Sequence, residues 1–83
     1  MLKVSVISPE RVLFEGEVSS VVAPAFDGDV GILPQHAPMM TLLGSGELRL
    51  GPGGSAGRFV VDGGFLQVFQ DNVRVVTEKA AEA

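Results

Sequence analysis

The chain of 83 residues contains no cysteine, no tryptophan, no tyrosine and a single histidine. Without cysteine the protein has neither disulfide bonds nor thiolate metal sites. One histidine is too few for a histidine-based metal centre. No apolar run approaches the ~20 residues of a membrane-spanning helix. The opening residues Met1–Ser5 lack the apolar core of a signal peptide. These absences predict a small intracellular protein of one domain.

Basic residues are missing from almost half of the chain. No lysine or arginine occurs between Arg11 and Arg49, although this interval holds five acidic residues, and the formal net charge is −4. Nucleic-acid binding needs basic side chains that displace counterions from phosphates, so this class of function is disfavoured. An anionic membrane surface would repel the same interval, so direct insertion into a membrane is not expected either.

The apolar content is high for a domain of this size. Hydrophobic residues make up 46% of the chain, yet a domain this small buries only about 60% of the surface of its unfolded chain. Valine pairs such as Val21-Val22, Val60-Val61 and Val75-Val76 also place apolar side chains on both faces of a strand. We therefore expect an apolar outer surface that a partner covers.

Short runs of alternating or β-branched residues, separated by turn residues, predict an all-β domain. Asp27-Gly28 and Asp71-Asn72 are typical of tight turns, and Gly63-Gly64 indicates a bulge or a barrel corner. Only Thr77–Ala83 is compatible with a helix, one too short to be stable alone. The pattern favours an antiparallel sandwich or flattened barrel. The expected strands are residues 2–7, 12–15, 17–23, 30–33, 39–43, 47–50, 58–62, 65–70 and 73–78.

Residues Gly28–Pro38 form the most distinctive segment. Pro34 and Pro38 each remove a backbone donor and fix φ, which excludes a regular helix. The segment is too apolar for a solvated linker, because Val30, Ile32 and Leu33 would lie in water. A rigid and partly apolar loop of this kind predicts a docking surface, and we expect Asp29 and His36 to lie close together on it.

Enzymatic chemistry is not supported by any motif. His36 lacks the nucleophile and orienting acid of a catalytic triad, so a role in loop structure or in an interface is favoured. Pro52–Gly57 lacks the Lys-Ser/Thr pair of a phosphate loop and fits a hairpin tip. The four aspartates do not have calcium-loop spacing. We therefore expect no catalytic residue, no cofactor and no metal site.

Several segments together resemble the N-terminal β-domain of the epsilon subunit of F-type ATP synthases. The resemblance runs from Leu2 to about Lys79. It rests on segments that come in the family's order: Ser8-Pro9, Val18–Pro24, Gly28–Met39, Leu43–Leu48, Asp62–Val68 and Asn72–Val76.

The resemblance implies a flattened antiparallel sandwich of about ten strands in the rotor's central stalk, on the cytoplasmic face of the bacterial inner membrane. Such a subunit clamps the gamma subunit to the polar loops of the c-ring, so that proton flow drives ATP synthesis. The residues implied to face the c-ring are Gly28, Asp29, Val30, Gly31, Ile32, Leu33, Pro34, His36 and Pro38. Met39, Met40 and Leu42 are implied to face gamma.

Family members usually continue into a C-terminal helical hairpin, in which inhibition of ATP hydrolysis and nucleotide sensing reside. Residues 1–79 would be the sandwich domain, and residues 80–83 a tail where the hairpin would begin. We accordingly expect this chain neither to inhibit hydrolysis nor to bind ATP.

Two other functions remain possible at this point. A free-standing β-sandwich adaptor could bind a peptide along a sheet edge. An enzyme with a site around His36 is the third and weakest hypothesis.

Overall fold

The computed structural model describes all 83 residues and contains eight strands in one continuous sheet. The strand order is β2-β1-β8-β7-β6-β3-β4, and β5 pairs with β7. The only other element is a 3₁₀ turn at Pro52–Gly54. The strands are β1 (Leu2–Ile7), β2 (Val12–Val18), β3 (Val21–Ala25), β4 (Gly28–Ile32), β5 (Met39–Leu42), β6 (Ser45–Leu50), β7 (Gly57–Phe69) and β8 (Asn72–Glu82).

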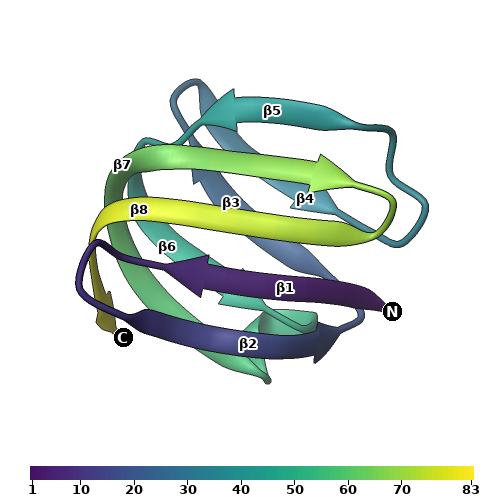
Figure 1. The fold of residues 1–83 in the computed structure, drawn as a ribbon, viewed down its shortest axis with the longest axis horizontal. Helices are drawn as coiled ribbons and strands as arrows, with labels where there is room; N and C mark the ends of the chain where they lie inside the picture. Colours follow the sequence, from purple (N-terminus) through teal and green to yellow (C-terminus); the bar gives the residue numbers. More distant parts are fainter.

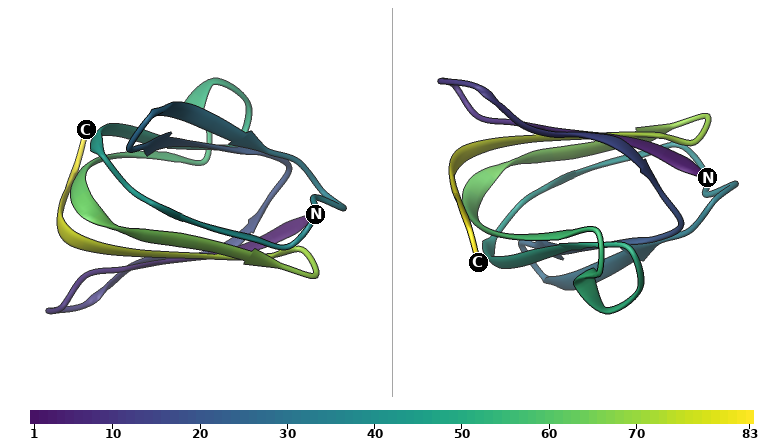
Figure 2. Two further views of the ribbon diagram at one scale, coloured as in Figure 1. Left: turned by 90° about the horizontal axis from the view of Figure 1, so that it is seen from above. Right: turned by 90° about the horizontal axis from the view of Figure 1, so that it is seen from below.

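The sheet folds onto itself as a two-layer sandwich, because β7 and β8 are long and curved (Figures 1 and 2). The first half of β7, Gly57–Asp62, pairs with β6. Its second half, Phe65–Val68, pairs with β5. The front layer consists of β5, β1, β2, the second half of β7 and the first half of β8. The back layer consists of β6, β3, β4, the first half of β7 and the end of β8. All-β sandwich architecture is therefore confirmed.

The turn from one layer to the other lies at Gly63 and Gly64, which have φ of 76° and 108°. Residues other than glycine rarely adopt such φ values. A Cβ on Gly64 would also overlap the carbonyl oxygen of Val76 on the adjacent strand. The barrel corner expected at this Gly-Gly pair is therefore confirmed, and β7 passes through it as one strand rather than two.

Three expectations about the strands were wrong. The sheet has eight strands rather than about ten, and the two strands expected at residues 58–62 and 65–70 are one strand, residues 57–69. It is not wholly antiparallel, since β1 runs parallel to β8. Residues Thr77–Glu82 are not helical: they continue β8 and pair with β7, which supplies backbone partners that a short isolated helix would lack.

A single core of 16 buried apolar side chains lies between the layers. Alternation along the strands supplies these side chains, as in β1, where Leu2, Val4 and Val6 are buried. In each of the three valine pairs one member is buried while its neighbour is half-buried or exposed, as predicted from the sequence. Five further apolar side chains, which are only partly buried, pack against this core: Leu13, Phe14, Val30, Met39 and Ala80.

Candidate interaction surfaces

The distinctive segment 28–38 is divided between a strand and a loop. Its first five residues form β4, which pairs with β3 so that Gly28 lies opposite Ala25 and Asp29 opposite Pro24. Asp29 is exposed and follows the turn at Phe26-Asp27 that joins the two strands. Ile32, at the other end of β4, is fully buried. It packs in the core and cannot offer its side chain to a partner.

Residues 33–38 form the loop that leads from β4 to β5, and hydrogen bonds fix its shape. The backbone N–H of His36 donates to the carbonyl oxygen of Leu33 over 3.2 Å. The N–H of Gln35, a residue with φ of 67°, donates to a carboxylate oxygen of Asp71 over 2.6 Å. Asp71 belongs to the turn between β7 and β8. The loop is therefore tied to the end of the sandwich where those two strands meet.

The expectation that Asp29 and His36 lie close together was wrong. Asp29 is next to the β3–β4 turn, whereas His36 follows the opposite end of β4 (Figure 1). The three residue steps from Asp29 to Ile32 alone span about 10 Å of extended strand. The segment therefore presents two separate exposed ends, which we call the β3–β4 tip (Phe26–Asp29) and the β4–β5 loop (Leu33–Pro38).

Strand β5 runs between these two ends and alternates in burial. Met39 packs against the core, while Met40 and Leu42 are 65% and 63% exposed. Phe26 at the tip is 68% exposed, and its N–H donates to the carbonyl oxygen of Leu42 over 3.1 Å. Of the three residues expected to point outward from this strand, Met40 and Leu42 do so and Met39 does not. Phe26 was not singled out from the sequence, although an aromatic residue beside Asp-Gly in a turn is a signal of an exposed position.

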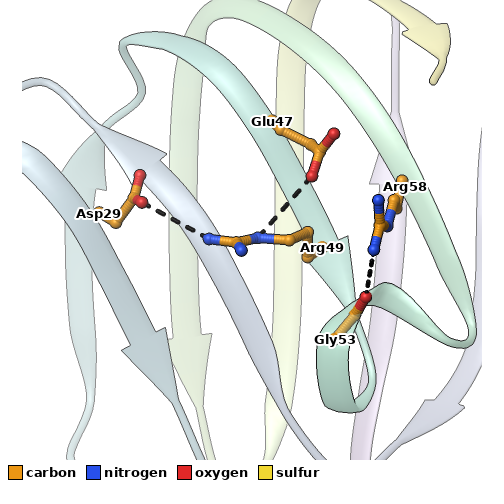
Figure 3. Close-up of polar contacts among 5 residues, drawn as sticks. All are labelled: Asp29, Glu47, Arg49, Gly53 and Arg58. Carbon is orange, nitrogen blue, oxygen red and sulfur yellow. Dashed lines mark hydrogen bonds and ion pairs between the residues drawn. The ribbon is translucent and has the colours of Figure 1, made fainter.

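Polar contacts on the back layer surround Arg49 of β6 (Figure 3). The Arg49 guanidinium lies 3.6 Å from Asp29 of β4 and 3.9 Å from Glu47. Arg58, directly opposite Arg49 on β7, instead donates to the carbonyl oxygen of Gly53 over 2.7 Å. The two cations thus have separate partners, which offsets the repulsion between like charges in opposed positions.

No arrangement in the structure resembles a catalytic or metal site. The His36 Nδ1 lies 2.7 Å from the carbonyl oxygen of Ala37, and the ring makes no hydrogen bond to an acid or a hydroxyl. No group of three histidine, aspartate or glutamate side chains is placed to hold a metal ion. Pro52–Gly57 connects β6 to β7, as expected of a hairpin tip. No helix is long and apolar enough to cross a membrane.

A protein-family model described as "ATP synthase, Delta/Epsilon chain, beta-sandwich domain" matches residues 1–83. The chain belongs to this family. Its β-sandwich is thus the one that ATP synthase delta and epsilon chains share, and the resemblance noted in the sequence is confirmed.

Similar proteins include several named ATP synthase epsilon chain. The one from Leptospira borgpetersenii serovar Hardjo-bovis (strain JB197) is 45% identical over 80 residues, which is 96% of this chain and 63% of that protein. The one from Desulforamulus reducens is 41% identical over 81 residues, 98% of this chain and 61% of that protein. The chain therefore spans about three fifths of the length of these relatives.

Two solved structures with the same fold are of mitochondrial ATP synthases. A chain in the Euglena gracilis OSCP/F1/c-ring structure has a TM-score of 0.87 and 23% identity, with 98% of this chain and 52% of that chain covered. A chain in the Tetrahymena thermophila central stalk/c-ring structure has a TM-score of 0.80 and 17% identity, with 98% and 66% covered. At these identities the likeness is one of fold.

Proposed function

We propose that the chain is a non-catalytic subunit of the rotor of an F-type ATP synthase, which holds the gamma subunit against the c-ring and so couples proton movement to ATP synthesis. In this role it is a peripheral part of the complex, on the cytoplasmic face of the bacterial inner membrane. The epsilon-type family match carries the proposal. The fold likeness to chains in central stalk and c-ring assemblies is consistent with it.

The separation of the two exposed ends suggests how contacts are divided between the two partners. The β3–β4 tip is small and protruding, and it carries Asp27 and Asp29 beside the exposed ring of Phe26. We assign this tip to the polar loops of the c-ring. The β4–β5 loop continues directly into Met40 and Leu42, so we assign the loop and β5 to gamma. This assignment limits the proposed c-ring contact to the β3–β4 tip, whereas the family resemblance implied residues along the whole segment 28–38.

Charge reversal at the tip tests this division. In membranes containing the complex, Asp29→Lys should lower the yield of ATP per translocated proton, because an exposed carboxylate that faces the ring becomes a cation. The Arg49 partner would also be lost, so Asp29→Asn serves as a second variant and should have a weaker effect of the same direction. The measurement is ATP synthesis against the rate of proton uptake.

Glu10→Lys provides the matched control, because it makes the same charge change at an exposed acid in the turn between β1 and β2. It should leave the coupling ratio unchanged. An equal loss in Glu10→Lys and Asp29→Lys would indicate a general charge effect and contradict the assigned tip. Failure of the chain to co-purify with ATP synthase subunits would contradict the whole proposal.

A further inference from the structure

The Asp29 carboxylate is held by an arginine that lies two strands away in the sheet. Asp29 is on β4, the edge strand of the back layer, and Arg49 is on β6, with β3 between them. The Arg49 Nη2 atom lies 3.6 Å from a carboxylate oxygen of Asp29 (Figure 3). Two strand spacings of about 4.8 Å separate β6 from β4, so the arginine side chain extends across β3. The β3–β4 tip is thereby attached to β6.

The register of the strands leaves room for this contact. Arg49 is opposite Val22 on β3, and Val22 is opposite Gly31 on β4. Because Gly31 has no side chain, the position on β4 that faces Arg49 across β3 neither blocks the guanidinium nor offers it a partner. Asp29 lies two residues before Gly31 and therefore on the same face of the strand. The chain gives the Asp29 carboxylate no other ion pair.

The guanidinium of Arg49 has little freedom to move. Its Nε is buried and has no hydrogen-bond partner within the chain. The same atom lies 3.9 Å from a carboxylate oxygen of Glu47, which is on the same strand. A guanidinium is planar and rigid, so a buried Nε restricts where the two terminal nitrogens can lie. Asp29 is thus held by a group whose own position is set by the sheet.

The charges around this contact leave the site negative. Arg49 faces two carboxylates, those of Asp29 and Glu47, so one negative charge remains uncompensated. Asp27, which is also exposed on the tip, has no ion pair. The arginine therefore does not cancel the attraction of the tip for a cation, and its main effect is on where the Asp29 carboxylate lies.

We propose that Arg49 is a positioning residue for the contact between the β3–β4 tip and the c-ring. It holds the Asp29 carboxylate at one place on the edge strand, where a cation or an N–H donor of a c-ring loop meets it. The inference rests on the proposed function and deepens it, because it names the group that orients the contact. Asp27 lacks such a group, so it adds negative charge to the tip without a fixed contact.

Substitution of Arg49 in membranes containing the complex tests the positioning role. Arg49→Gln should lower the yield of ATP per translocated proton, although it removes a cation and makes the tip more negative. Arg49→Lys should recover part of the loss, because lysine keeps the charge but lacks the planar guanidinium. A higher yield in Arg49→Gln would show that the arginine competes with the ring for Asp29, and the proposal would then be wrong.

Arg58→Gln is the matched control. It removes the same charge from the residue directly opposite Arg49 on β7, but the partner of Arg58 is the carbonyl oxygen of Gly53 rather than a carboxylate of the tip. The yield should stay unchanged in this variant. An equal loss in Arg49→Gln and Arg58→Gln would indicate a general effect of net charge and would overturn the positioning role.

A double variant shows whether Arg49 acts through Asp29. Adding Arg49→Gln to Asp29→Asn should lower the yield no further than Asp29→Asn alone, because the effects of two residues that share one contact do not add. Losses that add would mean that Arg49 acts through another group, which contradicts the proposal.

Carboxyl chemical shifts of the isotope-labelled chain test the contact without the rest of the complex. The side-chain carboxyl resonance of Asp29 should move in Arg49→Gln and with added salt, and should stay in place in Arg58→Gln. A resonance that does not move in Arg49→Gln would overturn the inference while the rotor role stands. If the resonance moves but neither Arg49→Gln nor Asp29→Asn changes the yield, the assignment of the tip to the c-ring fails, and the inference fails with it.

Discussion

The outer faces of the two layers differ, although their inner faces serve the same core. The front layer exposes apolar side chains, among them Met40 and Leu42 of β5 and Val12 of β2, while the back layer carries Arg49 and Arg58, which have carboxylate or carbonyl partners. Inner positions of both layers are filled by the same kinds of residue, as Leu66 in front and Leu48 behind are both fully buried. Core packing thus constrains only one face of each layer.

The two layers exist as separate faces only because β7 bends at Gly64, and removing this bend should have the largest effect. We expect Gly64→Ala to lower the free energy of unfolding by more than about 4 kcal/mol, because the new Cβ would lie 2.7 Å from the Thr77 Cα in a backbone with φ of 108°. Urea titration followed by circular dichroism measures this loss.

Gly31→Ala is the control for the bend. Gly31 has no positive φ, and no heavy atom lies within 4 Å of the Cβ it would gain. The free energy of unfolding of Gly31→Ala should stay constant or rise by about 0.4–1 kcal/mol, because alanine lowers the conformational entropy of the unfolded chain. A similar loss in both variants would mean that strain at Gly64 does not set the bend.

The partner strand of the bend should show the next largest effect. Thr77 of β8 is buried, and its hydroxyl lies 3.0 Å from the carbonyl oxygen of Gly63 and 2.8 Å from that of Lys79. Thr77→Val keeps the volume but removes the donor, so we expect a loss of about 1–2 kcal/mol. Thermal unfolding should reveal it, and Thr77→Ser should recover part of the loss. An unchanged melting temperature in Thr77→Val would contradict this role.

The ion pairs of the back layer should matter less. Arg49 and its two carboxylate partners are partly exposed, and pairs of this kind contribute about 0–1 kcal/mol. We expect Arg49→Leu to change the free energy of unfolding by less than about 1 kcal/mol, with an effect that shrinks as salt is added. Denaturation at low and high salt measures both. A loss above that range would mean that charges hold the back layer together.

The exposed apolar side chains of the front layer should matter least for stability. Leu42→Gln removes an exposed apolar side chain without disturbing the backbone bond from Phe26, so unfolding should change by no more than about 0.5 kcal/mol. A large loss of stability in urea titration would show that Leu42 contributes to the fold, and the contrast between the two outer faces would then disappear.

Much of the fold could be predicted from local patterns. Alternation identified β1 with the correct bounds, and Gly63-Gly64 gave the corner, because period and backbone freedom are properties of neighbouring residues. The tail was misjudged as helix-compatible, since Lys79–Glu82 has weak strand propensity of its own and becomes a strand through pairing with β7. Its pairing partners lie 17 to 23 residues earlier in the chain, so a pattern read over a few neighbouring residues does not reveal them.

The sequence by itself determined the all-β class, the family and which side chains could be buried, because these follow from composition, alternation and motif order. Only the tertiary structure decided which distant residues share a face. Leu42 and Val12 lie on the same outer face, on the two strands that flank the front layer, although 30 positions separate them, and Asp29 and His36 lie apart although seven do. Strand register decides both outcomes, since backbone hydrogen bonds align whole strands and carry their side chains to positions that sequence distance does not reveal.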